Sequence, residues 1–145
     1  MPIMNYTTSI DSAKTASEIQ KCLARAGASA VMTLYDEDQV LSSIAFQISQ
    51  NGQVLSFQLP AQIDKVWQLL QSDNKVPRKL KTREQASRVT WRIIKDWIEA
   101  QMAIIEAEQA EMTEVFLPYL QDHTGQTVYQ RLESHGVSGL LGHTQ

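Results

Sequence analysis

The residues whose types and spacing could do chemistry are eight basic side chains that lie close together between Lys75 and Lys95. This segment contains one acid, Glu84, whereas the stretch from Asp96 to Asp122 contains seven acids and neither Lys nor Arg. Clustered cations are typical of surfaces that bind the phosphates of nucleic acids. The sequence therefore predicts a nucleic-acid-binding site formed by Arg78, Lys79, Lys81, Arg83, Arg88, Trp91, Arg92 and Lys95.

Several of these residues belong to one predicted helix. At 3.6 residues per turn, Arg88, Arg92 and Lys95 lie on the same face of that helix. Trp91 lies between the two arginines and is separated from Trp97 by roughly 120° of rotation. Because Trp97 falls in the main apolar row, Trp91 is expected either to stack on a nucleobase or to pack within the chain or a subunit interface.

The order of charges along this helix opposes the helix macrodipole, which favours acids at the amino end and bases at the carboxyl end. Three explanations fit the sequence. The charged side chains solvate an exposed face, the basic half binds nucleic acid, or two antiparallel copies set the basic half of one helix against the acidic half of the other. The last explanation predicts a homo-oligomer, a dimer or larger, that forms through the long helix.

Motifs for catalysis and metal binding are absent from the sequence. It contains no Gly-x-Ser-x-Gly elbow, no Gly-x-Gly-x-x-Gly turn and no phosphate-binding Gly-Lys-[Ser/Thr] loop. The histidines are too far apart for a metalloprotease or zinc-finger pattern, at His123, His135 and His143. Cys22 falls on the apolar side of a predicted helix. We predict no catalytic residue, no metal, no cofactor and no enzymatic activity.

A hairpin is the element that the sequence defines best. Asn51-Gly52 is the pair that a two-residue type I′ turn requires, because both positions need positive φ. This turn fixes the register, with Ile48 opposite Leu55, Phe46 opposite Phe57 and Ile44 opposite Leu59 on the apolar face, and with Ser49 opposite Val54, Gln47 opposite Ser56 and Ala45 opposite Gln58 on the other face. A strand over about 29–35, joined through an acidic turn, completes a three-stranded antiparallel meander.

Helices precede and follow the meander. A capping box of Thr15 and Glu18, with Gly27 beyond the last turn, predicts a helix over about 16–26. A second helix, of about three turns, begins near Ile63. Upstream of both, Thr-rich residues 5–10 favour a short edge strand.

The helix that carries the charges is predicted to be long. Thr82 caps it, and no Gly or Pro interrupts the sequence before Pro118. A helix over 83–117 would be roughly 50 Å long, which is longer than a domain of this size can cover. It therefore either breaks into two helices or extends beyond the domain and packs against another molecule. A short helix over about 126–134, ending at Gly136, follows.

The composition is that of one globular domain. The chain has 145 residues, of which 43% are hydrophobic and 20% are charged, and its formal net charge is only −3. We predict a single α+β domain over 1–136 and a flexible tail over 137–145. The single cysteine, the absence of a signal-like amino terminus and the absence of a long apolar segment predict a soluble, cytoplasmic protein of a reducing compartment, without a membrane partner.

The run TREQASRVTWRIIKDWIEAQMAIIEA over 82–107 resembles a family of small phage, prophage and plasmid-encoded proteins that has no assigned activity. Residues 27–36, 57–61 and 114–120 are similar to the same family, so that the resemblance covers most of 5–135. It implies a mobile-element setting. The order helix, meander, helix also resembles the topology of double-stranded RNA-binding domains, although the basic motif that begins the helix in that family is not found here.

These observations lead to an expected function. The chain is predicted to be a non-enzymatic accessory protein of a mobile element that binds nucleic acid through the basic 75–95 segment. The alternative is a homo-oligomeric interaction module that binds or sequesters a host protein or a small ligand between its subunits.

Overall fold

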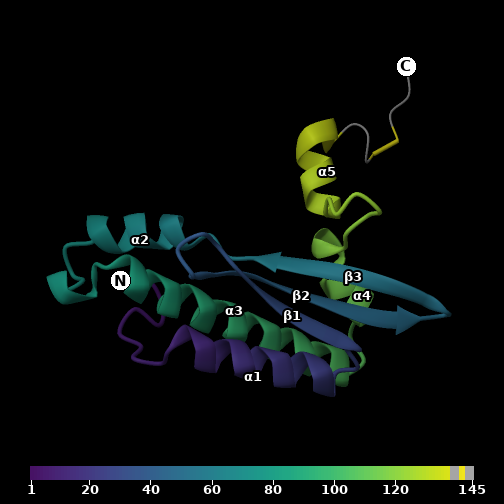
Figure 1. Ribbon diagram of the computed structural model, residues 1–145, viewed down its shortest axis with the longest axis horizontal. Coiled ribbons are helices and arrows are strands. Elements are labelled where there is room, and N and C mark those ends of the chain that lie inside the picture. The colour runs from purple at the N-terminus through teal and green to yellow at the C-terminus, as the bar shows by residue number, and fades with distance from the viewer. Residues whose placement is uncertain (138–140, 143–145) are drawn as a thin grey trace.

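The computed structural model describes residues 1–137, 141 and 142, and these residues form an α+β fold in which two helices cover one face of a three-stranded antiparallel sheet (Figure 1). The predicted order of helix, meander, helix, long helix and short final helix is confirmed. The elements are α1 (Ser12–Arg25), β1 (Ala30–Tyr35), β2 (Leu41–Gln50), β3 (Gln53–Pro60), α2 (Ile63–Ser72), the 3-10 turn η1 (Arg78–Leu80), α3 (Arg83–Glu106), α4 (Met112–Val115), the 3-10 turn η2 (Leu117–Tyr119) and α5 (Val128–His135).

The sheet has the order β1-β2-β3, and the predicted hairpin register is confirmed at all six pairs. Asn51 and Gly52 adopt φ values of 52° and 80°, as a type I′ turn requires. One face of the sheet packs against α1 and α3. Among the described residues no helix covers the other face, on which Met32 and Val54 are exposed and Ser43 is buried.

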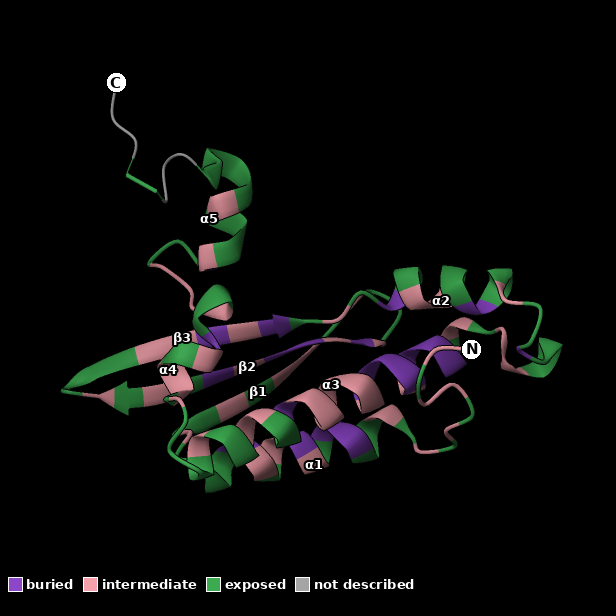
Figure 2. Cartoon of the chain, turned by 180° about the vertical axis from the view of Figure 1, so that it is seen from behind, coloured by how far each residue is buried: buried purple, intermediate pink, exposed green. Residues whose placement is uncertain are grey.

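The main core lies between the sheet and the two helices, where Figure 2 shows the buried residues gathered. Ile44 and Phe46 of β2 point into it, together with Phe57 of β3. Ile19 of α1 and Trp91 of α3 are fully buried in the same cluster as these strand residues. The apolar face that the hairpin register predicts is therefore the face that the helices cover.

The helix α3 begins as predicted and ends earlier. The Thr82 hydroxyl accepts a hydrogen bond from the Gln85 backbone N–H at 3.0 Å, which caps the first turn. The helix ends at Glu106 after 24 residues and the short helix α4 follows, so of the two alternatives that the sequence leaves open for 83–117 the structure shows the broken helix. The chain turns at Glu108, where φ is +60°, and returns to bury Phe116 against the sheet.

The amino-terminal segment differs from the prediction in two places. Residues 4–7 form a turn, so the predicted edge strand over 5–10 is wrong. The helix α1 begins at Ser12 and not near residue 16, and Thr15 is buried inside it. The sequence predicts that the Thr15 hydroxyl caps the first turn of the helix. In the structure this hydroxyl is buried and accepts a hydrogen bond from Arg92 of α3 at 3.4 Å instead.

The last part of the chain lies beyond the β3 edge of the sheet (Figure 1). The Gln121 backbone N–H donates to the Ser56 carbonyl at 2.8 Å, and Leu120 forms a bridge with Phe57. The helix α5 then ends at Gly136, as predicted. The predicted flexible tail over 137–145 falls largely on residues 138–140 and 143–145, which lie outside the described residues.

Candidate nucleic-acid interface

The structure separates the predicted basic cluster into two groups. The first group lies along α3, and each of its members forms an ion pair with an acid of the same chain. We call it the helix cations: Arg83, Arg88, Arg92 and Lys95. The second group lies in the connector, residues 73–82 between α2 and α3, and forms no ion pair within the described part of the chain. We call it the connector cations: Lys75, Arg78, Lys79 and Lys81.

Arg83 is held by acids from two other elements. Its Nε donates to Asp64 Oδ1 at 2.9 Å, and its Nη2 donates to Asp36 Oδ2 at 3.3 Å. Asp36 also accepts the backbone N–H of Val40 at 3.0 Å and of Asp38 at 2.8 Å. These backbone hydrogen bonds, with a further contribution from Arg83, lower the pKa of Asp36. The acidic turn between β1 and β2 therefore neutralises the first cation of α3.

Arg92 and Lys95 share one acid on α1. Arg92 Nη1 lies 3.0 Å from Glu18 Oε1, and Lys95 Nζ lies 3.5 Å from Glu18 Oε2. Both cations are mostly covered, with 14% and 15% of their side-chain surface exposed. Burial alone would raise the pKa of Glu18, but the two cations outweigh it and hold that pKa below its ordinary value. These charges join α1 to α3 and are not available to an external phosphate.

We expect the variant E18Q to lose stability at neutral pH and not in acid. Glu18 contributes stability that is present above the ordinary carboxyl pKa and is lost as the pH falls through its lowered folded-state value. At pH 7 the variant should be less stable by about 1 kcal/mol, since two cations lose their shared partner. Urea unfolding at pH 7 and at about pH 2.5, well below the ordinary carboxyl pKa, measures this difference. An equal loss at both pH values would contradict the assignment.

Arg88 is also engaged within the chain. Its Nη2 donates to Glu84 Oε1 at 2.6 Å, and its Nη1 donates to Gln85 Oε1 at 3.1 Å. Gln85 is buried, and its amide donates to the carbonyls of Tyr6 and Thr8 at 2.9 Å each. Arg88 therefore belongs to a network that holds the amino-terminal segment on α3.

Trp91 is not available to stack on a nucleobase, so that part of the predicted site is wrong. Its side chain is fully buried, and Nε1 donates to the Leu41 carbonyl at 3.1 Å. The rotation between Trp91 and Trp97 is as predicted, but Trp91 is the one that points into the core. Trp97 is half-buried and meets the rings of Phe116 and Tyr119 edge-on.

The connector has a fixed backbone. Val76 is buried against Ile63, Leu70 and Ala86, and Leu80 packs on the same cluster. The Trp67 indole N–H donates to the Lys81 carbonyl at 3.1 Å, which ties the connector to α2. The apolar side chains of Val76 and Leu80, together with the hydrogen bond from Trp67, thus hold the connector backbone against α2 and α3.

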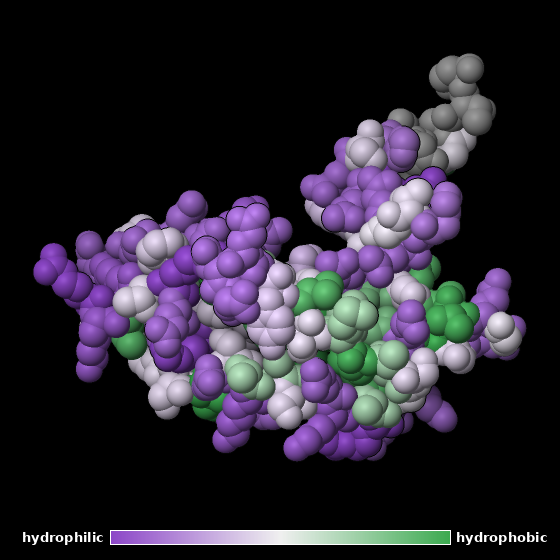
Figure 3. Space-filling view, viewed as in Figure 1, coloured by the Kyte–Doolittle hydropathy of each residue, from purple (hydrophilic) through white to green (hydrophobic). Residues whose placement is uncertain are grey.

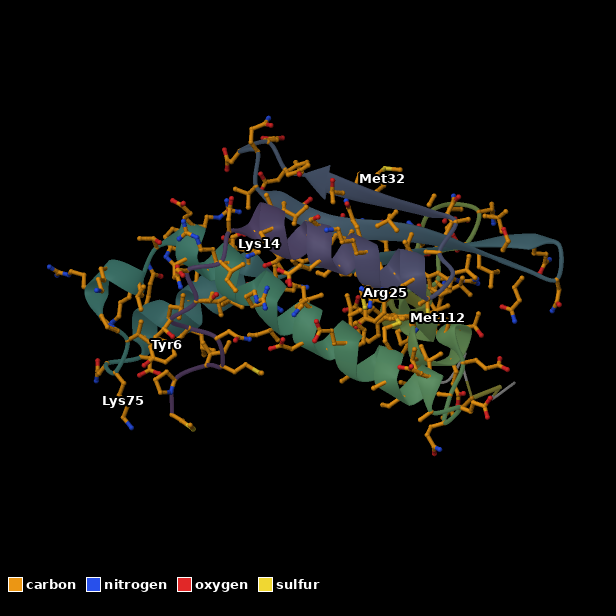
Figure 4. The ribbon with its side chains drawn as sticks, turned by 90° about the horizontal axis from the view of Figure 1, so that it is seen from below. Tyr6, Lys14, Arg25, Met32, Lys75 and Met112 are labelled. Carbon is orange, nitrogen blue, oxygen red and sulfur yellow. The ribbon has the colours of Figure 1, made fainter. Side chains whose placement is uncertain are left out.

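The connector cations point outward from this fixed backbone. Lys75, Arg78 and Lys79 are exposed, while Lys81 is half-buried and its Nζ donates to the Gln71 carbonyl at 3.2 Å. Figure 4 shows Lys75 directed away from the body of the molecule. In Figure 3, hydrophilic residues cover the end that α2 and the connector form. Lys65 of α2 is an exposed cation at this end that the sequence analysis missed.

A pocket of about 390 Å³ lies beside the site, between the start of α1, the β1–β2 turn and the start of α3. Arg83 and Arg88 line it, but both guanidinium groups are directed at acids of the chain. The hydroxyls of Ser12 and Ser87 also line it, and they hydrogen-bond to each other at 2.9 Å. Four polar side chains of this pocket, Arg83, Arg88, Ser12 and Ser87, therefore already have partners within the chain.

The class of protein that the fold and site define is a small α+β domain with an anchored cationic connector at one end. Comparison of the chain with protein-family models, with curated proteins and with solved structures finds no match in any of the three. No helix among the described residues has the length and apolar character needed to cross a membrane. Within residues 1–137, 141 and 142, no cluster of three His, Cys, Asp or Glu side chains could hold a metal ion.

Proposed function

We propose that this chain is a non-enzymatic accessory protein of a mobile genetic element and that it binds nucleic acid through the connector cations. The observation that carries the proposal is the contrast between the two basic groups. The helix cations form ion pairs with acids of the chain. Three of the four connector cations are exposed, and none of the four forms an ion pair with an acid among the residues that the structure describes. Exposed, unpaired cations on a fixed backbone can meet phosphates without first giving up an internal partner.

The chemistry of this site predicts binding to the phosphate backbone without base readout. With Trp91 buried, none of the proposed side chains offers a flat aromatic surface to a base. A protein that neutralises about four phosphates of duplex DNA should lose roughly 100-fold in affinity between 50 and 200 mM salt. A ligand held by apolar contacts would show no such dependence.

The test is a fluorescence-anisotropy titration of labelled single-stranded and double-stranded oligonucleotides at two salt concentrations. The variant K75E/R78E/K79E should raise the Kd roughly tenfold or more and flatten the salt dependence. The matched control is K14E/K21E/R25E, which reverses three exposed cations on α1 and changes the net charge equally. The control should bind within about twofold of the wild type.

Two outcomes would reject the proposal. In the first, the wild type shows no salt-dependent binding to either oligonucleotide. In the second, the connector variant and the α1 variant lose affinity equally, which would show that only total charge matters. Circular dichroism of both variants verifies that the fold is intact, since every substituted side chain is exposed.

The mobile-element setting rests on the resemblance of residues 82–107 and the shorter segments to phage, prophage and plasmid-encoded proteins. The alternative function is a homo-oligomeric module that holds a host protein or small ligand between subunits joined through α3. Ile104, which is 40% exposed, gives α3 some apolar surface for such contact. The basic half of α3 already forms ion pairs with acids of the same chain, however. Its cations are therefore not free to pair with the acidic half of a second copy of the helix.

A further inference from the structure

The strand β1 forms an open edge of the sheet. The opposite edge, β3, is partly covered by the chain itself, at its middle, through the Gln121 hydrogen bond to Ser56 and the Leu120 bridge to Phe57. Within the described residues, β1 pairs with β2 on one side only. Figure 4 looks onto this edge and shows β1 with α1 beside it and no other element in front of it. An open edge presents unpaired backbone groups that can pair with another strand.

The sequence of β1 lacks the features that usually protect such an edge. Its six residues, Ala-Val-Met-Thr-Leu-Tyr, include no charged residue and no proline. Met32 is 58% exposed, and Figure 4 shows it pointing away from α1. The only irregularity is a shift in register between Leu34 and Tyr35, at the end of the strand.

The open face of the sheet continues this neutral surface. Eleven residues of the three strands point to this face, and none is charged: Ala30, Met32, Leu34, Ser43, Ala45, Gln47, Ser49, Val54, Ser56, Gln58 and Pro60. Figure 3 shows hydrophobic residues gathered over the strands on this side of the molecule. Exposed sheet faces usually carry charged residues, so the absence of charge over the whole face is unusual for a surface that meets only water.

The flank of α1 beside this edge is also neutral. The glutamate that binds Arg92 and Lys95 marks the side of α1 that faces α3. Rotation by 100° per residue places a different row on the opposite side, next to the β1 edge. That row consists of small or uncharged residues: Ala13, Ser17, Gln20 and Ala24. Small side chains allow two helices to approach closely.

We propose that β1 pairs antiparallel with β1 of a second copy of this chain, giving a two-fold dimer with one continuous six-stranded sheet. In such a dimer the same patch meets itself across the axis, so a patch of one charge sign would repel its copy. The connector is basic, and the turn after α3 is acidic with Glu106, Glu108 and Glu111. The β1 edge, with its neutral strand, sheet face and helix flank, is the surface that can meet its own copy without repulsion.

The hairpin geometry sets the register of this pairing. A two-residue hairpin makes Gln50 and Gln53 a hydrogen-bonded pair, and alternation then directs the backbone groups of Ala45 and Gln47 toward β1. The backbone groups of Val31 and Thr33 therefore point away from β2. Two-fold pairing centred on Thr33 sets Met32 against Leu34 of the second copy. The interface would be about 20 Å long and would include one layer of strands and one layer of helices. The surface area that it buries would be at the low end of the range for specific dimers, so we expect a micromolar Kd.

The test is light scattering of the full chain over a dilution series from about 1 to 200 μM, with two lysine variants. M32K places a charge next to the dimer axis, opposite Leu34 of the second copy, and should raise the dimer Kd at least about tenfold. The matched control, V54K, changes another exposed apolar residue of the same face, 61% exposed, on the strand farthest from the edge, and should leave the Kd unchanged. Amide exchange should be slowed at Val31 and Thr33 at high concentration in the wild type.

The proposal is overturned if the wild type is a monomer at every concentration, or if M32K and V54K weaken the dimer equally. It is also overturned if I104K dissociates the dimer while M32K does not, because the contact would then lie on α3. The inference does not depend on nucleic-acid binding. The connector variant K75E/R78E/K79E should therefore dimerise like the wild type.

Discussion

The variant W91A is expected to be the most destabilised single substitution in the main core, with a free energy of unfolding lowered by about 4 kcal/mol. Trp91 is fully buried between the sheet and α1, so truncation leaves a large cavity. It also leaves the Leu41 carbonyl without the indole N–H that now donates to it at 3.1 Å. Urea unfolding followed by circular dichroism measures the loss.

Two further variants separate the causes of this loss. W91F keeps an aromatic ring in the core but removes the hydrogen bond and part of the buried ring volume, so it should cost about 2 kcal/mol, less than W91A. W97A removes the same residue type from the same helix at a half-buried position, and its loss should be smaller than that of W91A. Equal losses for W91A and W97A would show that Trp91 is not the centre of the core.

The variant F116A should release the carboxyl-terminal segment from the sheet as well as lower stability, by about 3–4 kcal/mol. Phe116 is fully buried, and its ring lies 5.4 Å from the ring of Phe46 and 5.5 Å from that of Trp97, edge-on to both. It is the buried residue that follows the turn at Glu108. The other apolar residues of the segment that pack on this core, Met112, Val115, Tyr119 and Leu120, are only partly buried, so Phe116 is the main apolar anchor of the segment after α3.

Proteolysis detects this release directly. A glutamate-specific protease should cut F116A at Glu108 or Glu111 much faster than the wild type, because the backbone around these exposed residues becomes free to unfold locally when the segment leaves the sheet. The matched control is L117A, at a neighbouring apolar residue that is exposed. L117A should be cut at the wild-type rate. A wild-type rate for F116A would mean that Leu120 and Gln121 alone keep the segment in place.

Local signals were sufficient to predict the sheet. The Asn51-Gly52 turn has few backbone solutions, and alternation then assigns each residue to a face, so that one dipeptide predicts six correct pairs. The Thr82 cap is similarly local. The break after Glu106 could not be predicted in this way, since no Gly or Pro marks it. It depends on Phe116 reaching a core formed by strands more than fifty residues earlier.

The candidate site was predicted only in part, for a related reason. The sequence shows the cations of α3 next to one another but does not show that Glu18, Asp36 and Asp64 meet them in space. Trp91 was expected near the surface because arginines flank it, yet a helix turns by 100° per residue and its neighbours face elsewhere. The part of the cluster that the structure leaves exposed lies in the connector, where no acid of the described residues pairs with Lys75, Arg78 or Lys79.

The acids that follow α3 lie at the far end of that helix from the connector, about 36 Å away along its axis. These two groups of charges therefore contribute an electric dipole along α3, with its positive end at the connector. A polyanion would exert a torque on this dipole before any contact, turning the molecule so that the connector leads. Encounters should therefore be pre-aligned in dilute salt and become random in orientation once the Debye length falls well below the length of the helix.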